Sequence, residues 1–365
     1  MASEAPGIAI APVTAPVVRA VEDRFNVAAH GLRGVAAMMV FLAHLLGGTA
    51  EHIYAANQHY VEAIKPYWHL GTYGVELFFV ISGFVILPSV RRYTLGEFGL
   101  RRLLRLYPMF FAFSVLFVVL NGLTNAYPAL NTPVAIVSGF LFLNLFTGTE
   151  QLTPNAWSLT FEVLFYLCIA VTWHVAFVRR SAILTLLAGG ASLAFLASFP
   201  ITLYFVVGVA IRIAHDRGLL LPQPLAAGLE ALALALVARL AAIDHYEYTH
   251  AELADPAVVA LIVATGVYFW LAVHAGSLTA RLLGNRATLY LGTVSYSLYI
   301  VHPYVYLPVR MLFDRMGWFT PDIMVSMALF ALAVTPPMLL ATDIVHRRLE
   351  RWPYARFFRQ GIYKA

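Results

Sequence analysis

Charged residues and cysteine are both scarce in this 365-residue sequence. Asp, Glu, Lys and Arg make up 12% of it, whereas soluble globular domains carry about 25%. So few charges cannot cover the surface of a water-soluble protein of this length, which excludes a soluble enzyme. The single cysteine, Cys168, excludes an internal disulfide, a cysteine-rich zinc site and an iron–sulfur cluster.

Apolar residues are abundant instead: they form 61% of the chain, and the mean hydropathy is +0.76. Long apolar stretches follow one another from about residue 31, and roughly 20 apolar residues suffice for a helix to cross a bilayer. We therefore predict an all-α, polytopic membrane protein with about ten transmembrane helices. The predicted spans lie near 31–49, 71–90, 106–123, 156–177, 181–198, 200–214, 224–243, 256–275, 287–309 and 322–345.

The chain divides into three predicted regions. Residues 1–28 contain prolines and acidic residues and lack a compact apolar run with a cleavage site, which favours a cytoplasmic tail over a cleaved signal peptide. Residues 29–346 form the transmembrane domain. Residues 347–365 form a basic cytoplasmic tail whose aromatic side chains are expected to anchor it near anionic lipid. A tail of this length predicts no appended soluble domain.

The distribution of basic residues predicts the orientation. With ten spans and a cytoplasmic N-terminus, all but four of the 24 Lys and Arg residues fall on the cytoplasmic side, a strong positive-inside bias. Counting the short segment 133–147 as an eleventh span would reverse every later loop and destroy that bias. We therefore predict that both termini are cytoplasmic and that 133–147 is a short re-entrant or interfacial helix on the outer side. The net charge of +5 reports orientation, and we expect no nucleic-acid partner.

Four ionisable side chains fall inside predicted spans at a similar depth: His44, Glu76, Glu162 and His302. Ionisable groups within a membrane are costly, so each is a candidate functional residue. A histidine beside a carboxylate at this depth is suited to general acid–base chemistry. We predict that the four converge in the outer half of the membrane. The alternative for His44 is a structural hydrogen bond to a neighbouring helix, and the alternative for His302 is that it caps a helix kinked at Pro303.

Arg33 and His44 are eleven residues apart, which returns them to nearly the same helix face about 16 Å apart along the axis. Arg33 therefore lies near the cytoplasmic end of the first span. With Arg101, Arg102 and Arg105 it forms a predicted basic rim suited to phosphates. The alternative is that these arginines only determine topology.

Six polar or glycine-containing segments follow one another from residue 31 to about 353: RGVAAMMVFLAH (Arg33 to His44), GVELFFVISGFVI, RRLLRLYP, NAWSLTFEVLFY, GTVSYSLYIVHP and HRRLERWP. In this order they resemble the motifs of the acyltransferase 3 family, membrane enzymes that modify sugars and other hydroxyl compounds. One departure is Glu76, where the family usually has the shorter Asp.

The resemblance implies acyl transfer from cytoplasmic acyl-coenzyme A, with acetyl-CoA as the default co-substrate, to a hydroxyl handled at the outer face. It implies that His44 is the acid–base residue, and we expect Arg33 and Glu162 to be catalytic with it. Arg33 and the other rim arginines are expected to contact the coenzyme A phosphates. We expect no metal and no permanently bound cofactor. Roles in binding the substrate or the acyl group are expected for Glu76, Ser82, Trp157, Ser158, Tyr166, Ser295, Tyr296 and His302.

The chain is similar to stand-alone family members, which often decorate exopolysaccharide, lipopolysaccharide or their lipid-linked precursors. We therefore predict a multi-pass O-acyltransferase of the bacterial cytoplasmic (inner) membrane that acts on a glycan or lipid-linked glycan and contacts membrane lipid. One alternative is a small-molecule acceptor such as a macrolide. Another is a secondary transporter, which would be expected to show paired repeats with broken helices.

Overall fold

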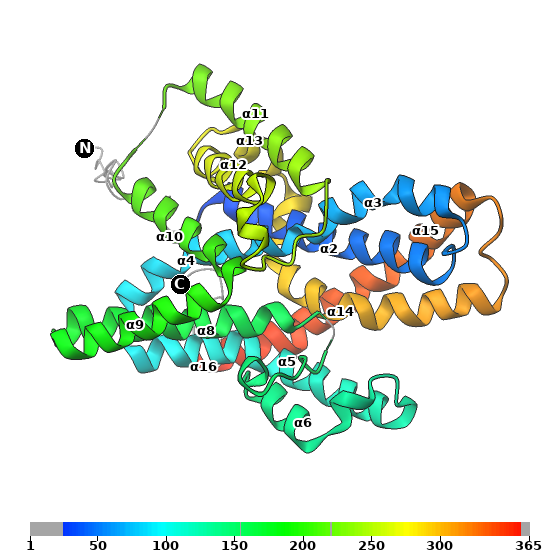
Figure 1. The fold of residues 1–365 in the computed structure, drawn as a ribbon, viewed down its shortest axis with the longest axis horizontal. Helices are drawn as coiled ribbons and strands as arrows, with labels where there is room; N and C mark the ends of the chain where they lie inside the picture. Colours follow the sequence, from blue (N-terminus) through cyan, green and yellow to red (C-terminus); the bar gives the residue numbers. More distant parts are fainter. Residues whose placement is uncertain (1–24, 154, 220, 359–365) are drawn as a thin grey trace, which may run out of the picture.

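The computed structural model describes residues 25–153, 155–219 and 221–358, which form helices and connecting loops without a β-strand (Figure 1). The predicted all-α class is confirmed for this part of the chain. Every predicted span overlaps a helix. These helices are α2 (Val27–His52), α4 (Gly74–Arg92), α5 (Leu95–Thr124), α8 (Trp157–Trp173), α9 (Ala182–Ser198), α10 (Leu203–Asp216), α11 (Gln223–Ala241), α12 (Pro256–Ala272), α14 (Arg286–Arg315) and α15 (Ile323–Val345).

Within the described residues, five helices are long and apolar enough to cross a membrane. The number rises to six if Ala182–Ser198 and Pro200–Asp216, which meet at 114°, form one broken span. The molecule is therefore an all-helical membrane protein with five or six clear spans, and the count of ten stays a prediction. The five helices are Val27–His52, Gln58–Arg92, Leu95–Thr124, Trp157–Val178 and Ile323–Phe357.

The two predicted tails are only partly visible. Residues 1–24 of the N-terminal tail and residues 359–365 of the C-terminal tail lie outside the described residues. The rest of the C-terminal tail continues α15 through the π-helical η5 (His346–Arg351) into α16 (Trp352–Phe357).

The segment 133–147 is too short to cross the membrane. It forms α6 (Pro133–Phe140), whose eight residues span about 12 Å, and α7 (Asn144–Thr147), whereas a bilayer core is about 30 Å thick. Phe142 turns the chain between them with a left-handed φ of 56°. Its ring stacks on Phe110, halfway along α5, with the ring centroids 4.4 Å apart. The segment thus reaches the middle of α5, which favours the re-entrant alternative over the interfacial one.

Two close helix contacts position the polar residues. A Cβ on Gly34 of α2 would lie 2.7 Å from the backbone nitrogen of Gly292 of α14, so these two backbones almost touch. On the other side of α2, Phe79 of α4 stacks on Phe205 of α10, which also stacks on Phe165 of α8, at centroid distances of 4.2 and 4.4 Å. Helices α2, α4, α8 and α14 therefore surround a common centre.

Candidate functional site

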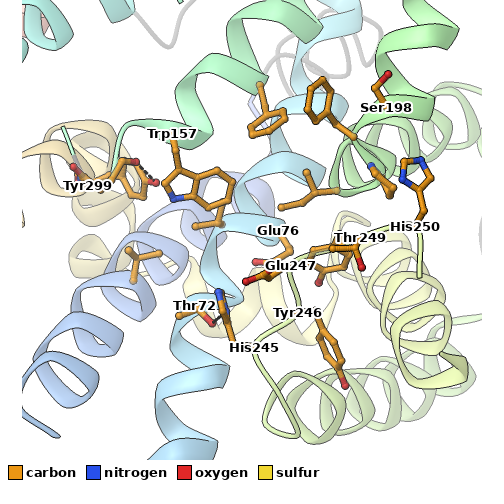
Figure 2. A pocket seen from close by; sticks show the side chains of 18 of the residues that line it. Thr72, Glu76, Trp157, Ser198, His245, Tyr246, Glu247, Thr249, His250 and Tyr299 are labelled. Atoms are coloured by element: carbon orange, nitrogen blue, oxygen red, sulfur yellow. Dashed lines mark hydrogen bonds between the residues drawn. The ribbon is translucent and has the colours of Figure 1, made fainter. Parts of the chain in front are cut away.

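A cavity of about 660 Å³ lies where α2, α4, α8 and α14 meet. Its lining includes His44, Glu76, Trp157 and Tyr299, one from each of these helices, and the loop 245–250 (Figure 2). A hydrogen bond joins that loop to the segment before α4: His245 Nδ1 lies 3.1 Å from the Thr72 hydroxyl. The lining segments belong to the predicted outer loops and the adjoining ends of spans, so the cavity lies on the predicted outer side.

His44 is oriented by two acceptors. Its Nδ1 lies 2.9 Å from the Val40 carbonyl oxygen and 3.4 Å from Nε2 of His302, and the two ring centroids are 4.8 Å apart. A carbonyl oxygen only accepts, so Nδ1 of His44 carries the proton and donates it. In the neutral ring this leaves the lone pair on Nε2, the state that a general base requires.

Glu76 lines the cavity and has one buried carboxylate oxygen without a hydrogen-bond partner in the described part of the chain. The side chain is only 6% exposed, and its Oε2 has no hydrogen-bond partner among the described residues. The Tyr248 hydroxyl lies within hydrogen-bonding reach of this carboxylate and 3.0 Å from the Tyr204 hydroxyl. Burial, reinforced by the nearby Glu76 carboxylate, raises the pKa of Tyr248, so its hydroxyl stays protonated. Oε2 is thus a buried acceptor atom that has no partner among the described residues.

Trp157 and Ser158, neighbours at the start of α8, differ in position. Trp157 is 37% exposed and lines the cavity, where its amphipathic ring can face a substrate. The buried Ser158 bonds the Tyr299 hydroxyl at 2.8 Å, and that hydroxyl donates to the Asn155 carbonyl oxygen at 2.6 Å. Ser158 therefore fixes the wall formed by Tyr299 and does not itself line the cavity.

Glu162 lies in a second polar group away from the cavity lining. It accepts a hydrogen bond from Ser82 at 2.8 Å and another from Tyr166. The Arg102 guanidinium lies over the Tyr166 ring, 5.3 Å from its centroid. Of the four ionisable groups predicted to converge, the structure joins His44 with His302 and places Glu76 on the same cavity, but it places Glu162 with Ser82.

The arginines of the predicted basic rim differ in their hydrogen-bond and ion-pair partners. Arg101 is held by an ion pair with Glu97 at 2.8 Å and by the Tyr354 hydroxyl at 3.0 Å. Arg102 donates to Ser89 at 3.0 Å, and within the described ranges neither Arg102 nor Arg33 forms an ion pair. Of these three arginines, only Arg101 forms an ion pair in the described part of the chain, and Arg105 is 9% exposed.

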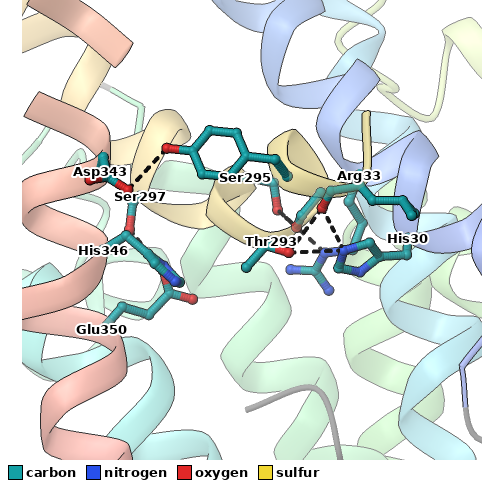
Figure 3. Close-up of polar contacts among 11 residues, drawn as sticks. His30, Arg33, Thr293, Ser295, Ser297, Asp343, His346 and Glu350 are labelled. Carbon is teal, nitrogen blue, oxygen red and sulfur yellow. Dashed lines mark hydrogen bonds and ion pairs between the residues drawn. The ribbon is translucent and has the colours of Figure 1, made fainter. Parts of the chain in front are cut away.

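The inner half of α14 carries two further predicted residues, Ser295 and Tyr296. Ser295 accepts from Arg33 Nε at 3.5 Å (Figure 3), and the Tyr296 hydroxyl donates to the Leu106 carbonyl oxygen at 2.7 Å. Arg33 and His44 thus both face α14 from one side of α2, in agreement with their spacing. Tyr296 connects α14 to α5 and does not line the cavity.

Sequence reasoning missed two features of these sites. The cavity loop 245–250 carries no motif, and nothing in the sequence signals its position. Glu350 is fully buried and accepts from Ser297 and from His346 Nδ1, each at 2.8 Å (Figure 3). The HRRLERWP motif marked its segment but could not identify these partners.

A family model described as an acyltransferase domain matches residues 26–342, which contain His44, Glu76, Glu162 and His302. No curated protein and no solved structure matches the sequence.

Proposed function

The chain belongs to the acyltransferase 3 family, and from that premise we propose that it is a membrane O-acyltransferase using cytoplasmic acyl-coenzyme A. Acetyl-CoA is the default donor. The acceptor is a hydroxyl group of a cell-surface or exported polysaccharide, or of its lipid-linked precursor. We place the enzyme in the bacterial inner membrane with ten spans, both termini cytoplasmic and residues 133–147 re-entrant.

The observation that carries this proposal is the hydrogen bond between Nδ1 of His44 and the Val40 carbonyl oxygen at the edge of the cavity. The Nδ1 proton of His44 is engaged by Val40 and His302, so Nε2 accepts the proton of the substrate hydroxyl as that oxygen attacks the thioester carbon. The carbon–sulfur bond then breaks, and the departing thiolate takes the proton back from Nε2. The products are the ester and free coenzyme A, and His44 returns to its starting state.

The cavity supports a sugar-like acceptor over an apolar macrolide. The Glu76 carboxylate lines the cavity as a hydrogen-bond acceptor, and Trp157 offers a flat amphipathic surface. The loop 245–250 adds polar side chains, including His245, Glu247 and Thr249. A polyhydroxylated ring matches this mixture of one carboxylate, aromatic faces and polar loop groups.

The arginines support a donor entering from the other side. Arg33 lies about 16 Å from His44 along α2, a distance that the pantetheine arm of coenzyme A has to span. Arg33 and Arg102 form no ion pair in the described part of the chain, which suits them to phosphate groups. Glu162, hydrogen-bonded to Ser82 and Tyr166, then acts on the donor side of the site.

The experiment uses purified protein in lipid nanodiscs with labelled acetyl-CoA and an undecaprenyl-linked oligosaccharide. We expect label to reach the glycan, and His44→Ala to lower the rate by about 10²- to 10⁴-fold while the protein still folds. Transfer only to a soluble macrolide would replace the glycan by the small-molecule alternative. Full activity of His44→Ala would contradict the assignment of the base.

A further inference from the structure

His302 lies next to His44, on the side away from the cavity. His302 on α14 is fully buried and does not line the cavity, so it cannot contact the acceptor as first expected. Its ring packs against Phe41 and Tyr299, each with a centroid distance of 6.2 Å. The position of the His302 ring is therefore fixed by packing, and its side-chain hydrogen-bond partner is His44.

The protonation of His302 follows from its own helix. Nδ1 lies 3.2 Å from the Leu298 carbonyl oxygen, which can only accept, so Nδ1 carries the proton. Nε2 of the neutral ring is then an acceptor, and it lies 3.4 Å from Nδ1 of His44. The two rings thus have complementary tautomers, one donating Nδ1–H and one accepting Nε2.

Within the described ranges, no carboxylate orients either of these two histidines. In the described residues, neither His44 nor His302 forms an ion pair with an acidic side chain. Among the residues that the structure describes, the only other partner of His44 Nδ1 is the Val40 carbonyl oxygen, which also accepts the backbone N–H of His44 within the helix. The partner that orients a catalytic histidine is often a carboxylate; here an imidazole occupies that position.

We propose that His302 is a positioning residue for His44. Its Nε2 accepts the Nδ1 proton of His44, keeps the lone pair of His44 on Nε2, and stabilises the imidazolium that forms during transfer. This inference rests on the proposed function, because it assigns His44 the role of the base. It requires no proton transfer to His302 itself.

The test compares two substitutions of similar size, one with a hydrogen-bond acceptor and one without. His302→Gln places an amide oxygen near the position of Nε2, whereas His302→Leu removes the acceptor at similar volume. In nanodiscs, His302→Leu is expected to lower kcat about 10- to 100-fold with the acceptor KM unchanged, and His302→Gln to restore most of kcat. Wild-type kcat in His302→Leu, equal losses in both variants, or a change in KM alone would overturn the proposal.

A third variant keeps the proposal testable if His302→Leu does not fold. His302→Asn keeps a donor for the Leu298 carbonyl but is too short to reach His44, so it should lose kcat as His302→Leu does. Size-exclusion chromatography and thermal unfolding identify variants that fold. If His302→Asn folds and keeps wild-type kcat, the proposal fails.

A second measurement separates this inference from the proposed function. Diethyl pyrocarbonate acylates an unprotonated imidazole nitrogen, and mass spectrometry of the His44 peptide follows this reaction without any acyl acceptor. His44 should react more slowly in His302→Leu than in the wild type or His302→Gln. Equal rates would overturn the role of His302, whereas absence of glycan acylation by the wild type would overturn only the proposed function.

Discussion

At the residue scale, hydrogen bonds to backbone carbonyls set the chemistry of the two histidines. Val40 and Leu298 each lie four residues before the ring they face, so each helix supplies the carbonyl that fixes its own imidazole. Any helical histidine can form such a bond. What distinguishes this site is that the two rings meet, since only then does one nitrogen donate to the other.

Glu76→Gln tests the unpaired carboxylate oxygen at the cavity. The amide group places a hydrogen-bond donor where the carboxylate has the accepting oxygen Oε2. We therefore expect kcat/KM for the acceptor substrate to fall about 10- to 100-fold, which corresponds to the loss of a charged hydrogen bond of about 1.5–3 kcal/mol. Steady-state kinetics in nanodiscs measure this. The control is Glu150→Gln in an exposed loop, which should leave the kinetics unchanged; an unchanged Glu76→Gln would remove Glu76 from the acceptor site.

Tyr166→Phe tests the second polar group. The substitution removes the hydrogen bond from Tyr166 to Glu162 and keeps the one from Ser82. We therefore expect the free energy of unfolding to fall by about 1.5–3 kcal/mol. Thermal unfolding in detergent measures the change. Tyr67→Phe, at a site 63% exposed, serves as the control, and equal stability of the two variants would show that the Tyr166 hydroxyl contributes nothing.

At the element scale, glycines decide which helices can touch. Helix α4 meets α10 so closely that a Cβ on Gly83 would lie 2.1 Å from the Phe205 carbonyl oxygen, and one on Gly208 would lie 2.0 Å from that of Val80. Small residues at both positions let the backbones approach. The same contact holds the aromatic stack below Glu76.

Gly208→Ala should therefore disturb the pair α4 and α10. The added methyl group has no room next to the Val80 backbone, so we expect a loss of about 1–3 kcal/mol or more of stability and a lower midpoint of thermal unfolding. Gly189→Ala on α9 is the matched control, because nothing lies within 4 Å of its Cβ position. An equal midpoint for both variants would contradict the close contact.

At the scale of the whole molecule, the cavity and the arginines lie toward opposite ends of α2. The segments that line the cavity all adjoin predicted outer loops, whereas Arg33 lies near the predicted cytoplasmic end. An enzyme built this way can take its donor from one side of the membrane and its acceptor from the other. The topology is therefore part of the proposed mechanism.

Cysteine labelling tests that topology, because Cys168 is the single native cysteine. In a Cys168→Ala background, Glu62→Cys and Glu247→Cys should react with a membrane-impermeant thiol reagent added to intact cells. Arg217→Cys and Arg286→Cys should react only after the cells are opened, since they lie in predicted inner loops. The same accessibility for both groups would refute the ten-span orientation.

The re-entrant segment has its own test by the same method. Ala129 and Glu150 flank segment 133–147 and are both exposed. If the segment turns back at Phe142, both Ala129→Cys and Glu150→Cys should be labelled from outside. Labelling of only one of them in intact cells would show that the segment crosses the membrane.

The sequence by itself determined the class of the protein. Composition and apolar runs predicted an all-helical membrane protein, and each predicted span overlaps a helix, because hydropathy acts on segments without regard to their neighbours. The ordered motifs predicted the family that the family model confirms. The spacing of Arg33 and His44 also predicted that they share a face, since the helical period is fixed.

Only the tertiary structure decided which polar groups meet. His44 and His302 are 258 positions apart, and their contact depends on how closely α2 and α14 pack, which no local pattern encodes. For the same reason Glu162 joins Ser82, and the motif-free loop 245–250 completes the cavity. The depth of a side chain in the membrane follows from its position along the helix. Which other side chain it contacts depends on how that helix is rotated and on the helices packed against it.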